Sequence, residues 1–232
     1  MVILPEGYCI DSTEVTRDQY AAWLATNPAL PSIGDANCGW NTTFAPDADC
    51  MSSSTVCEGT GCGNHPQSCV NWCDAYAYCA GVGKRLCGNR GGGANSFDSY
   101  MNENTSQWYN ACASGSAANN YPYGKTYYSA TMSGPPYYSA TACNGPELGN
   151  GSTTAVGSLS GCQASGPYAG VYDLSGNVSE WEDSCNSTGQ SAFCHFRGGN
   201  FFLSGDFLAC NCDIYGERQS TSSGIGFRCC SP

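Results

Sequence analysis

The segment GVYDLSGNVSEW, residues 170–181, is the most informative stretch of this 232-residue chain. Asp173 and Glu180 place carboxylates near its two ends, and Gly176 allows a turn between them. Carboxylates and backbone carbonyls are the hard oxygen donors that calcium prefers in proteins. Two acids at this spacing are more commonly part of a solvated loop, so the segment by itself leaves a metal-binding loop and a plain surface turn open.

Two segments upstream of it have the pattern of helices. In GYCIDSTEVTRDQYAAWL (7–24), Thr16 and Gln19 form a capping-box pair ahead of an apolar run, which predicts a helix after the short strand GYCID. In VNWCDAYAYCAGVGKRL (70–86), Asn71 can cap a second helix whose apolar residues share one face. Both helices are short and amphipathic.

The remaining elements are expected to be short strands separated by coil. Glycine-flanked FRGGNF (196–201) and GIGFRC (224–229) follow the central segment. Residues 88–170 are rich in Gly, Ser and Asn and predict mostly coil. The strands are expected at 170–172, 195–197 and 226–229.

Taken in this order, the segments at 7–24, 70–86, 170–181, 196–201 and 224–229 resemble the formylglycine-generating enzyme family, also called the sulfatase-modifying factor domain. The resemblance spans nearly the whole chain. It implies an α+β fold with high coil content, a C-type-lectin-like single domain over residues 1–232. A Cys-rich irregular insertion is expected at about 28–69, where Pro, Gly, Ser, Asn and Cys occur without periodicity.

The 18 cysteines predict a disulfide-rich, exported protein. Zinc is the competing interpretation, but the short-range cysteine pairs lack C-x₂-C spacing and the chain has only two histidines. The resemblance implies that Cys79 pairs with Cys229 and Cys112 with Cys210. The sequence leaves the other pairings open.

The charge pattern restricts the partners. Nineteen acidic residues against eight basic ones give a formal net charge of -11, the wrong sign for binding a nucleic-acid backbone. No apolar run approaches the length of a membrane-spanning helix. The expected partner is therefore a protein, peptide or glycan, or a second copy in a homo-oligomer.

Calcium is the predicted cofactor. The resemblance implies a calcium site with ligands from Asp173, Gly176, Val178 and Glu180. It places a possible second site near Asn144 and Gly145. At that second site Gly157 stands where the family has an aspartate, which weakens the expectation.

The oxidases of this family hold copper(I) with two cysteines, and the matching positions here are Leu203 and Gly205. Because copper(I) prefers soft thiolate ligands, no formylglycine-forming activity is expected. Cys210 and Cys212 are a conceivable displaced pair, although Cys210 matches a structural bridge of the family. Neither His65 nor His195 lies in a motif that identifies a catalytic triad, and no catalytic residue is assigned.

Binding is the function that remains, through the surface formed by residues 200–223. Aromatic side chains among polar ones are typical of a recognition surface. The alternatives are a structural subunit of a cell-surface or filamentous assembly, and an oxidase-type enzyme with a displaced thiol site. The residues expected on the binding surface are Phe202, Asp206, Phe207, Asn211, Asp213, Tyr215, Glu217 and Arg218.

Overall fold

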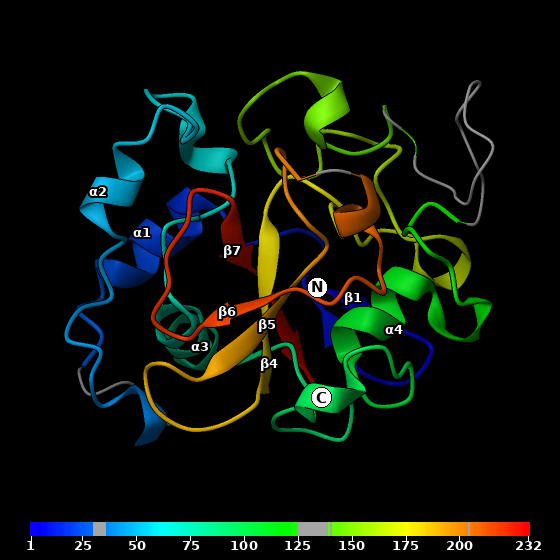
Figure 1. The fold of residues 1–232 in the computed structure, drawn as a ribbon, viewed down its shortest axis with the longest axis horizontal. Coiled ribbons are helices and arrows are strands. Elements are labelled where there is room, and N and C mark those ends of the chain that lie inside the picture. The colour runs from blue at the N-terminus through cyan, green and yellow to red at the C-terminus, as the bar shows by residue number, and fades with distance from the viewer. Residues whose placement is uncertain (30–35, 125–138, 140, 204) are drawn as a thin grey trace.

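The computed structural model describes residues 1–29, 36–124, 139, 141–203 and 205–232. Two four-stranded sheets form its centre, with helices around them and long irregular connections (Figure 1). The α+β, coil-rich architecture is as predicted. The part of the predicted coil at 125–138 lies outside the described residues.

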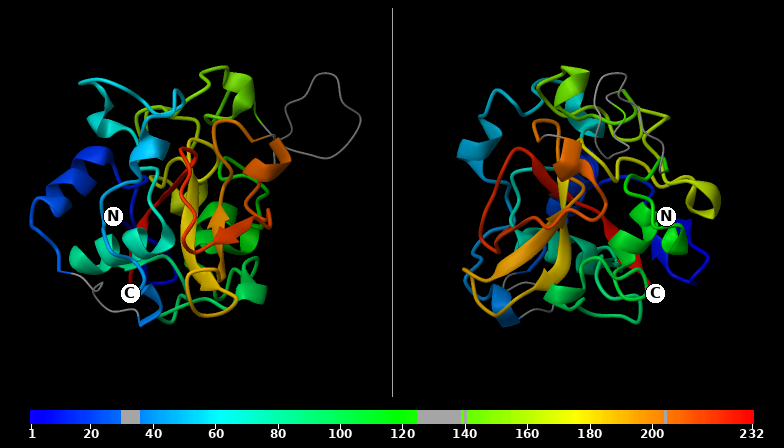
Figure 2. Two further views of the ribbon diagram at one scale, coloured as in Figure 1. Left: turned by 60° about the vertical axis from the view of Figure 1, so that its left-hand side comes forward. Right: turned by 45° about the vertical axis from the view of Figure 1, so that its right-hand side comes forward.

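The first sheet brings the two chain ends together. Its order is β1-β2-β8-β3, and β8 pairs with both β2 and β3 in antiparallel register. Figure 2 shows both termini on the same side of the molecule. The strands are β1 (Val2–Ile3), β2 (Cys9–Ile10), β3 (Arg85–Leu86) and β8 (Cys229–Ser231).

The second sheet carries the polar interior described below. Its order is β6-β5-β4-β7, so the central segment of the sequence leads directly into an inner strand. β4 pairs antiparallel with β5 and parallel with β7, which places Glu180 beside both Arg197 and Gly226. The strands are β4 (Ser179–Cys185), β5 (Phe193–Arg197), β6 (Tyr215–Glu217) and β7 (Ile225–Phe227).

Both predicted helices are confirmed. Thr16 and Gln19 form the reciprocal capping box of α1, and Asn71 caps α3 with Asp74 as its partner. Tyr20 of α1 stacks on Tyr78 of α3 with 5.5 Å between ring centroids, and both rings contact Phe227 of β7. These contacts bury the apolar faces of the two helices against the second sheet. The α-helices are α1 (Arg17–Leu24), α2 (Ala48–Met51), α3 (Trp72–Gly81) and α4 (Gln107–Ala113).

The connections between these elements are largely irregular, but they contain short 3₁₀ helices. Figure 1 shows α1, α2 and α3 on one side of the second sheet and α4 on the other. The turns are η1 (Ala36–Cys38), η2 (Cys62–Asn64), η3 (Phe97–Ser99), η4 (Gly115–Ala117), η5 (Pro146–Leu148), η6 (Gly166–Tyr168) and η7 (Gly205–Leu208).

Eight disulfides hold these connections in place. The two pairings implied by the family resemblance, Cys79–Cys229 and Cys112–Cys210, are confirmed. Three bridges lie in or leave the segment at 28–69, which contains only short helical turns in its described part. The other pairs are Cys38–Cys73, Cys50–Cys69, Cys57–Cys62, Cys87–Cys230, Cys143–Cys162 and Cys185–Cys194.

Only Cys9 and Cys212 remain as thiols among the described cysteines, and both are partly accessible. Alkylation of the unfolded, unreduced protein is therefore expected to modify two cysteines, and alkylation after reduction all 18. Intact-mass analysis counts the added groups. A count of ten or more without reduction would show that the disulfide framework is not the native covalent state.

No helix in the described ranges is long and apolar enough to cross a membrane.

Candidate functional site

A buried ion pair lies where the central segment enters β4. The Arg228 guanidinium donates from Nε to Glu180 Oε2 and from Nη2 to Oε1, both at 2.6 Å, and Trp108 Nε1 donates to Oε2 at 2.9 Å. Burial alone lowers the pKa of Arg228, but the Glu180 carboxylate outweighs it and raises the pKa above its usual value. Arg228 also donates to the carbonyls of Asp11 and Tyr172, so one side chain joins three segments.

A second pair of acids lies beside this ion pair. Asp173 Oδ2 accepts from the Gly157 amide at 2.5 Å, and Glu14 Oε1 accepts from Asn177 Nδ2 at 2.9 Å. Burial raises the pKa of both acids, and the neighbouring Asp173 charge raises the pKa of Glu14 further. Glu14 Oε2 is buried and has no hydrogen-bond partner.

The loop at 143–154 is tied to the central segment by Asn177. The side-chain Oδ1 of Asn177 accepts from Thr154 N at 2.8 Å and from Asn144 Nδ2 at 3.1 Å. The backbone N–H of Asn177 donates to the backbone carbonyl of Asn144. Gly176, at φ 74°, lies against the same carbonyl, where any Cβ would come within 2.4 Å of the oxygen. Glycine is therefore required at 176 for this close backbone approach.

These contacts bear on the predicted calcium ligands. Glu180 is engaged by Arg228 and Trp108, whereas Asp173 faces Glu14 and Gly157, so the two predicted side-chain ligands have different partners. A calcium ion on Glu180 would lie against a guanidinium. As they stand in the structure, the Asp173 and Glu180 side chains therefore do not fit one calcium cage, and over the described ranges no three His, Cys, Asp or Glu side chains are grouped to hold a metal. Asn144, from the second predicted site, is hydrogen-bonded to Ser152 and Asn177.

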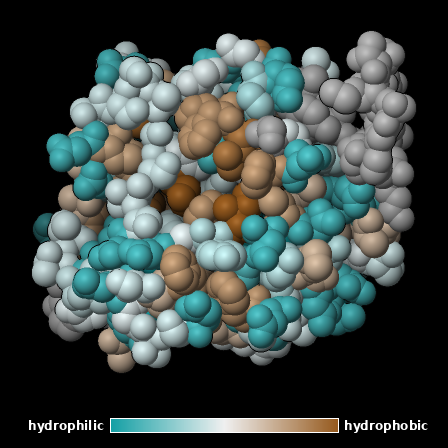
Figure 3. All heavy atoms as spheres, viewed as in Figure 1, coloured by the Kyte–Doolittle hydropathy of each residue, from teal (hydrophilic) through white to brown (hydrophobic). Residues whose placement is uncertain are grey.

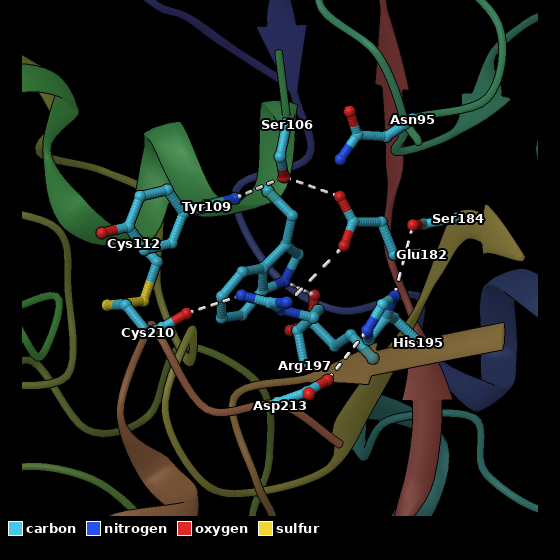
Figure 4. Close-up of polar contacts among 12 residues, drawn as sticks. Asn95, Ser106, Tyr109, Cys112, Glu182, Ser184, His195, Arg197, Cys210 and Asp213 are labelled. Atoms are coloured by element: carbon cyan, nitrogen blue, oxygen red, sulfur yellow. Dashed lines mark hydrogen bonds and ion pairs between the residues drawn. A yellow bond between two sulfur atoms is a disulfide. The ribbon is translucent and has the colours of Figure 1, made fainter. Parts of the chain in front are cut away.

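A further polar cluster lies between β4, β5 and the 209–213 loop (Figure 4). Arg197 is fully buried, donates from Nη2 to the Cys210 carbonyl at 2.7 Å, and lies 3.9 Å from Glu182 Oε2. Its guanidinium also packs over the rings of Tyr100 and Trp108, at 5.1 and 5.2 Å from their centroids. Arg197 thus anchors the 209–213 loop to the sheet.

His195 links this interior to the surface. Its Nε2 lies 3.0 Å from Asp213 Oδ1 and its Nδ1 lies 3.3 Å from Ser184 Oγ. Burial, together with the charge of Arg197, lowers the pKa of His195, so the ring is neutral near pH 7. A carboxylate can only accept, so Nε2 carries the hydrogen and donates it to Asp213. The structure thus brings together a Ser, a His and an Asp that the sequence did not associate.

This trio is not a hydrolase site. Ser184 has no exposed surface, so no substrate can reach its hydroxyl. The carboxylate bonds to one ring nitrogen and the serine faces the other, so the two contacts together fix the orientation of the ring. The contacts therefore serve to position Asp213. A buried, neutral histidine orients this carboxylate at the surface, where the Asp213 side chain is 48% exposed.

Aromatic rings pack around the histidine that holds that carboxylate. Phe97 and Tyr100 stack on His195, with centroids at 4.1 and 5.0 Å. Tyr215 contacts Phe97 and Phe193 at 5.6 and 5.5 Å, with the ring planes steeply inclined. Phe193 and Tyr215 are exposed despite their size. We call Phe97, Tyr100, Phe193 and Tyr215 the aromatic face.

The loop residues 201–203 and 205–213 carry further exposed side chains. Phe202 and Phe207 are 53% and 44% exposed, and Asp206, Asn211 and Asp213 are exposed as well. Figure 3 shows apolar side chains gathered in a hollow at the middle of the face seen in Figure 1, with hydrophilic residues around it. Most residues expected on the binding surface therefore do lie at the surface, and Glu217 is half-buried among them.

Arg218 is a correction to that set. It is 3% exposed, its guanidinium packs over the Trp72 ring at 4.8 Å, and it donates to the carbonyls of Ser187 and Gly189. It holds the β4–β5 loop against the core and is not available to a ligand. Its amphipathic stem and forked donors suit this structural role.

The displaced thiol pair is also corrected. Cys210 is bridged to Cys112, so Cys212 is the one free thiol in its loop. Burial raises the pKa of the Cys212 thiol, which disfavours the thiolate needed for metal binding or nucleophilic attack. Cys210 and Cys212 therefore do not form a two-thiolate centre.

The family model for the sulfatase-modifying factor enzyme 1-like domain matches residues 2–231. The chain belongs to this family. No curated protein matches the chain in sequence. The family therefore rests on the domain model and on the fold.

Three solved structures have similar folds. PvdO from Pseudomonas aeruginosa has a TM-score of 0.60, and the match covers 96% of this chain and 79% of PvdO. CarF has a TM-score of 0.58 with 97% and 86% coverage, and Treponema denticola variable protein 1 has 0.56 with 97% and 84%. Each is 21% identical to this chain, which establishes the fold but not a shared function.

Two of the clefts elsewhere in this sulfatase-modifying-factor-like domain bear on its chemistry. The larger, of about 430 Å³, lies between α1 and the loop at 57–63 and includes Arg17, Asp18 and Met51. A second, of about 330 Å³, lies beside the start of α3 and contains Asp74. The first is a rival location for a ligand.

Asp74 has the chemistry of a pH-sensitive group. Its carboxylate accepts from Asn41 Nδ2 at 2.7 Å and from the Asn71 amide at 3.0 Å. Burial nevertheless raises the pKa of Asp74 to about 7 from 3.8. The folded protein therefore binds this proton more tightly than the unfolded chain does, and stability falls as pH rises from about 4 to about 7.

Asp74→Asn is expected to remove this dependence. Relative to the wild type, the free energy of unfolding of the variant should improve by about 3 kcal/mol between about pH 5 and about pH 8.5. Urea titrations of both proteins at the two pH values measure the difference. A pH-independent gap between them would show that Asp74 titrates normally.

Proposed function

We propose that this protein is an exported recognition module of the sulfatase-modifying factor family that binds a protein, peptide or glycan through the aromatic face and the adjoining 201–213 loop. The observation that carries the proposal is the exposure of large rings there. Phe193 and Tyr215 contact each other and are 39% and 48% exposed, and Phe202 and Phe207 on the loop are 53% and 44% exposed. Large exposed apolar side chains with polar residues around them mark interaction surfaces.

The frame beneath this surface supports binding. Cys185–Cys194 joins β4 to β5, and Cys112–Cys210 fixes the start of the 210–213 loop. Arg197 holds the Cys210 carbonyl and His195 orients Asp213 from below. A surface that is already ordered loses little conformational entropy when a ligand binds, so more of the contact energy appears as affinity.

Export is part of the proposal because of the eight disulfides. Such a framework persists in oxidising compartments and is reduced in most cytosols. The proposed function does not include calcium binding, since Arg228 already forms two hydrogen bonds with the Glu180 carboxylate.

Oxidase activity is the rival enzymatic function. Leu203 and Gly205 stand at the catalytic positions of the family, and Cys210 is held in a disulfide. Incubation of the copper-treated protein with a peptide carrying CxPxR, followed by mass spectrometry, tests this. Conversion of the peptide cysteine would require a catalytic centre away from residues 203–212 and would reject the binding-only function.

A structural subunit is the second candidate, and one observation favours it. β1 is an edge strand of the first sheet, and its Ile3 is 77% exposed. Exposed apolar edge strands are templates for pairing with another chain. Light scattering across a range of concentrations separates the two functions, because a monomer at all concentrations contradicts the subunit role.

The proposed function is tested by a binding array of peptides and glycans. The triple variant Phe202→Ala, Phe207→Ala, Tyr215→Ala is expected to lose about tenfold or more in affinity for any ligand that the wild type binds. The matched control is Ile3→Ala with Val82→Ala, two exposed apolar residues that belong neither to the aromatic face nor to the adjoining loop. Equal binding by wild type, control and triple variant would contradict the proposal.

A further inference from the structure

We propose that the ligand of the aromatic face is cationic, a protein segment that presents lysine or arginine side chains. This inference rests on the proposed function and names the chemistry of its ligand. Three observations carry it: where the protein's own basic groups lie, which charges border the face, and how the rings are arranged.

The basic side chains of the described residues are held within the fold. Each described Lys and Arg donates to a partner in the protein, in five of the seven cases to a backbone carbonyl. Such a bond leaves the positive charge in place but keeps the side chain from extending into solvent: Arg197, Arg218 and Arg228 are buried, and the other four are half-buried. The donors and their partners are Arg17 to Cys57 O, Lys84 to Asp11, Arg85 to Asn89 O, Arg90 to Glu103 O, Arg197 to Cys210 O, Arg218 to Gly189 O and Arg228 to Glu180.

The border of the face is acidic. Asp206 and Asp213 are exposed and Glu217 is half-buried, while the two arginines nearest in sequence, Arg197 and Arg218, are both buried. His195 does not compensate Asp213, because the ring is neutral near pH 7 and only donates a hydrogen bond to it. Complementary charge selects a positively charged partner and excludes a phosphate or sulfate group.

The ring arrangement offers more than one aromatic face to a cation. Tyr215 meets Phe97 at 61° and Phe193 at 68°, so the rings form corners and not one flat platform. A cation is attracted to the face of an aromatic ring, and rings that meet at a corner present faces in different directions. The same protein already places Arg197 over Tyr100 and Arg218 over Trp72, which shows that its rings accept guanidinium groups.

A fluorescein-labelled hexa-arginine peptide is the probe, with hexaglutamine as its neutral counterpart. Fluorescence anisotropy is expected to show hexa-arginine bound at least about tenfold more tightly, with affinity that falls as salt is added. The double variant Phe193→Ala, Tyr215→Ala keeps every charge and should weaken hexa-arginine by about tenfold. Asp213→Asn should weaken it by a similar factor.

The matched control removes an equal charge elsewhere. Glu58→Gln lies in the Cys57–Cys62 loop and is expected to leave the affinity within about twofold of the wild type. If Glu58→Gln weakens binding as much as Asp213→Asn, or the aromatic double variant has no effect, the peptide is held by net charge alone. Either result overturns the inference.

The outcomes also separate this inference from the proposed function. Suppose that the array yields a neutral or acidic ligand, and that the Phe202, Phe207, Tyr215 triple variant no longer binds it. That result would support the recognition surface but contradict the inference that its ligand is cationic. Array ligands that all survive the triple variant would reject the recognition surface itself. Melting temperatures of each variant confirm that the protein compared is folded.

Discussion

Replacing Arg228 by Met is expected to lower the free energy of unfolding by about 3–5 kcal/mol, since it removes the cation from a buried cluster of acids. Glu180 loses both 2.6 Å hydrogen bonds, and the carbonyls of Asp11 and Tyr172 lose their donor. Arg228→Lys keeps the charge without the forked geometry and should fall between wild type and Arg228→Met. Guanidinium chloride unfolding of the oxidised proteins measures all three.

Lys84→Met is the control for this experiment. Lys84 pairs with Asp11 at 2.6 Å, but both side chains are partly exposed, so its loss should cost at most about 1 kcal/mol. Equal costs for Lys84→Met and Arg228→Met would contradict the importance of the buried pair. Because Arg228 already neutralises Glu180, chelators are expected to leave the melting temperature unchanged. A saturable stabilisation by calcium that Glu180→Ala abolishes would restore the calcium loop.

Joint removal of the Cys79–Cys229 and Cys87–Cys230 disulfides is expected to have an effect of similar size. The two bridges tie residues 79 and 87 to β8, and all four cysteines are buried. They close nearly the same span, so either one alone keeps that loop closed. With both removed, the shortest remaining closure runs through Cys112–Cys210 and is roughly 50 residues long, which corresponds to about 4 kcal/mol of loop-closure entropy. The variant with Cys79→Ala, Cys87→Ala, Cys229→Ala and Cys230→Ala should therefore unfold at much lower denaturant than the wild type.

The Cys57–Cys62 bridge is its internal control. It spans only five positions, for which the same relation gives about 2 kcal/mol. Cys57→Ala with Cys62→Ala should be the milder variant when both are unfolded under the same conditions. If the short bridge proves the more costly, then the stabilisation does not come from constraining the unfolded chain.

Local signals in the sequence predict local structure well. The Thr16–Gln19 capping box and the Asn71 cap are short-range hydrogen bonds between neighbours in the chain, so their residue types alone indicate where α1 and α3 begin. The two disulfides implied by the family resemblance are also present. The other pairings depend on how distant loops approach each other, which spacing does not reveal.

Strand β4 shows why other parts were missed. Glu180, Glu182 and Ser184 are fully buried in it, yet acids and serines in a sequence usually indicate solvent. The two acids can be buried because Arg228, between β7 and β8, pairs with Glu180 and Arg197 of β5 lies beside Glu182. Those partners are 15 or more residues away in the chain, so the local pattern suggests a loop.

Only part of the candidate site could be predicted, because some of its residues come from distant parts of the chain. Phe202, Phe207, Asp213 and Tyr215 lie within one segment and are exposed, as the sequence indicated. Phe97 and Phe193 join them only through tertiary packing around His195. Arg218 was misplaced because a charged residue among surface residues gives no sign that its stem packs on Trp72.

Hydrogen-exchange mapping of a bound ligand is the decisive test of the recognition surface. The protein is compared with and without the tightest ligand found on the array, at saturating ligand concentration. Exchange is expected to slow at residues 193–197 and 205–217, where the aromatic face and its adjoining loop lie. Protection confined instead to α1 and residues 57–63, around the larger cleft, would contradict the proposed surface.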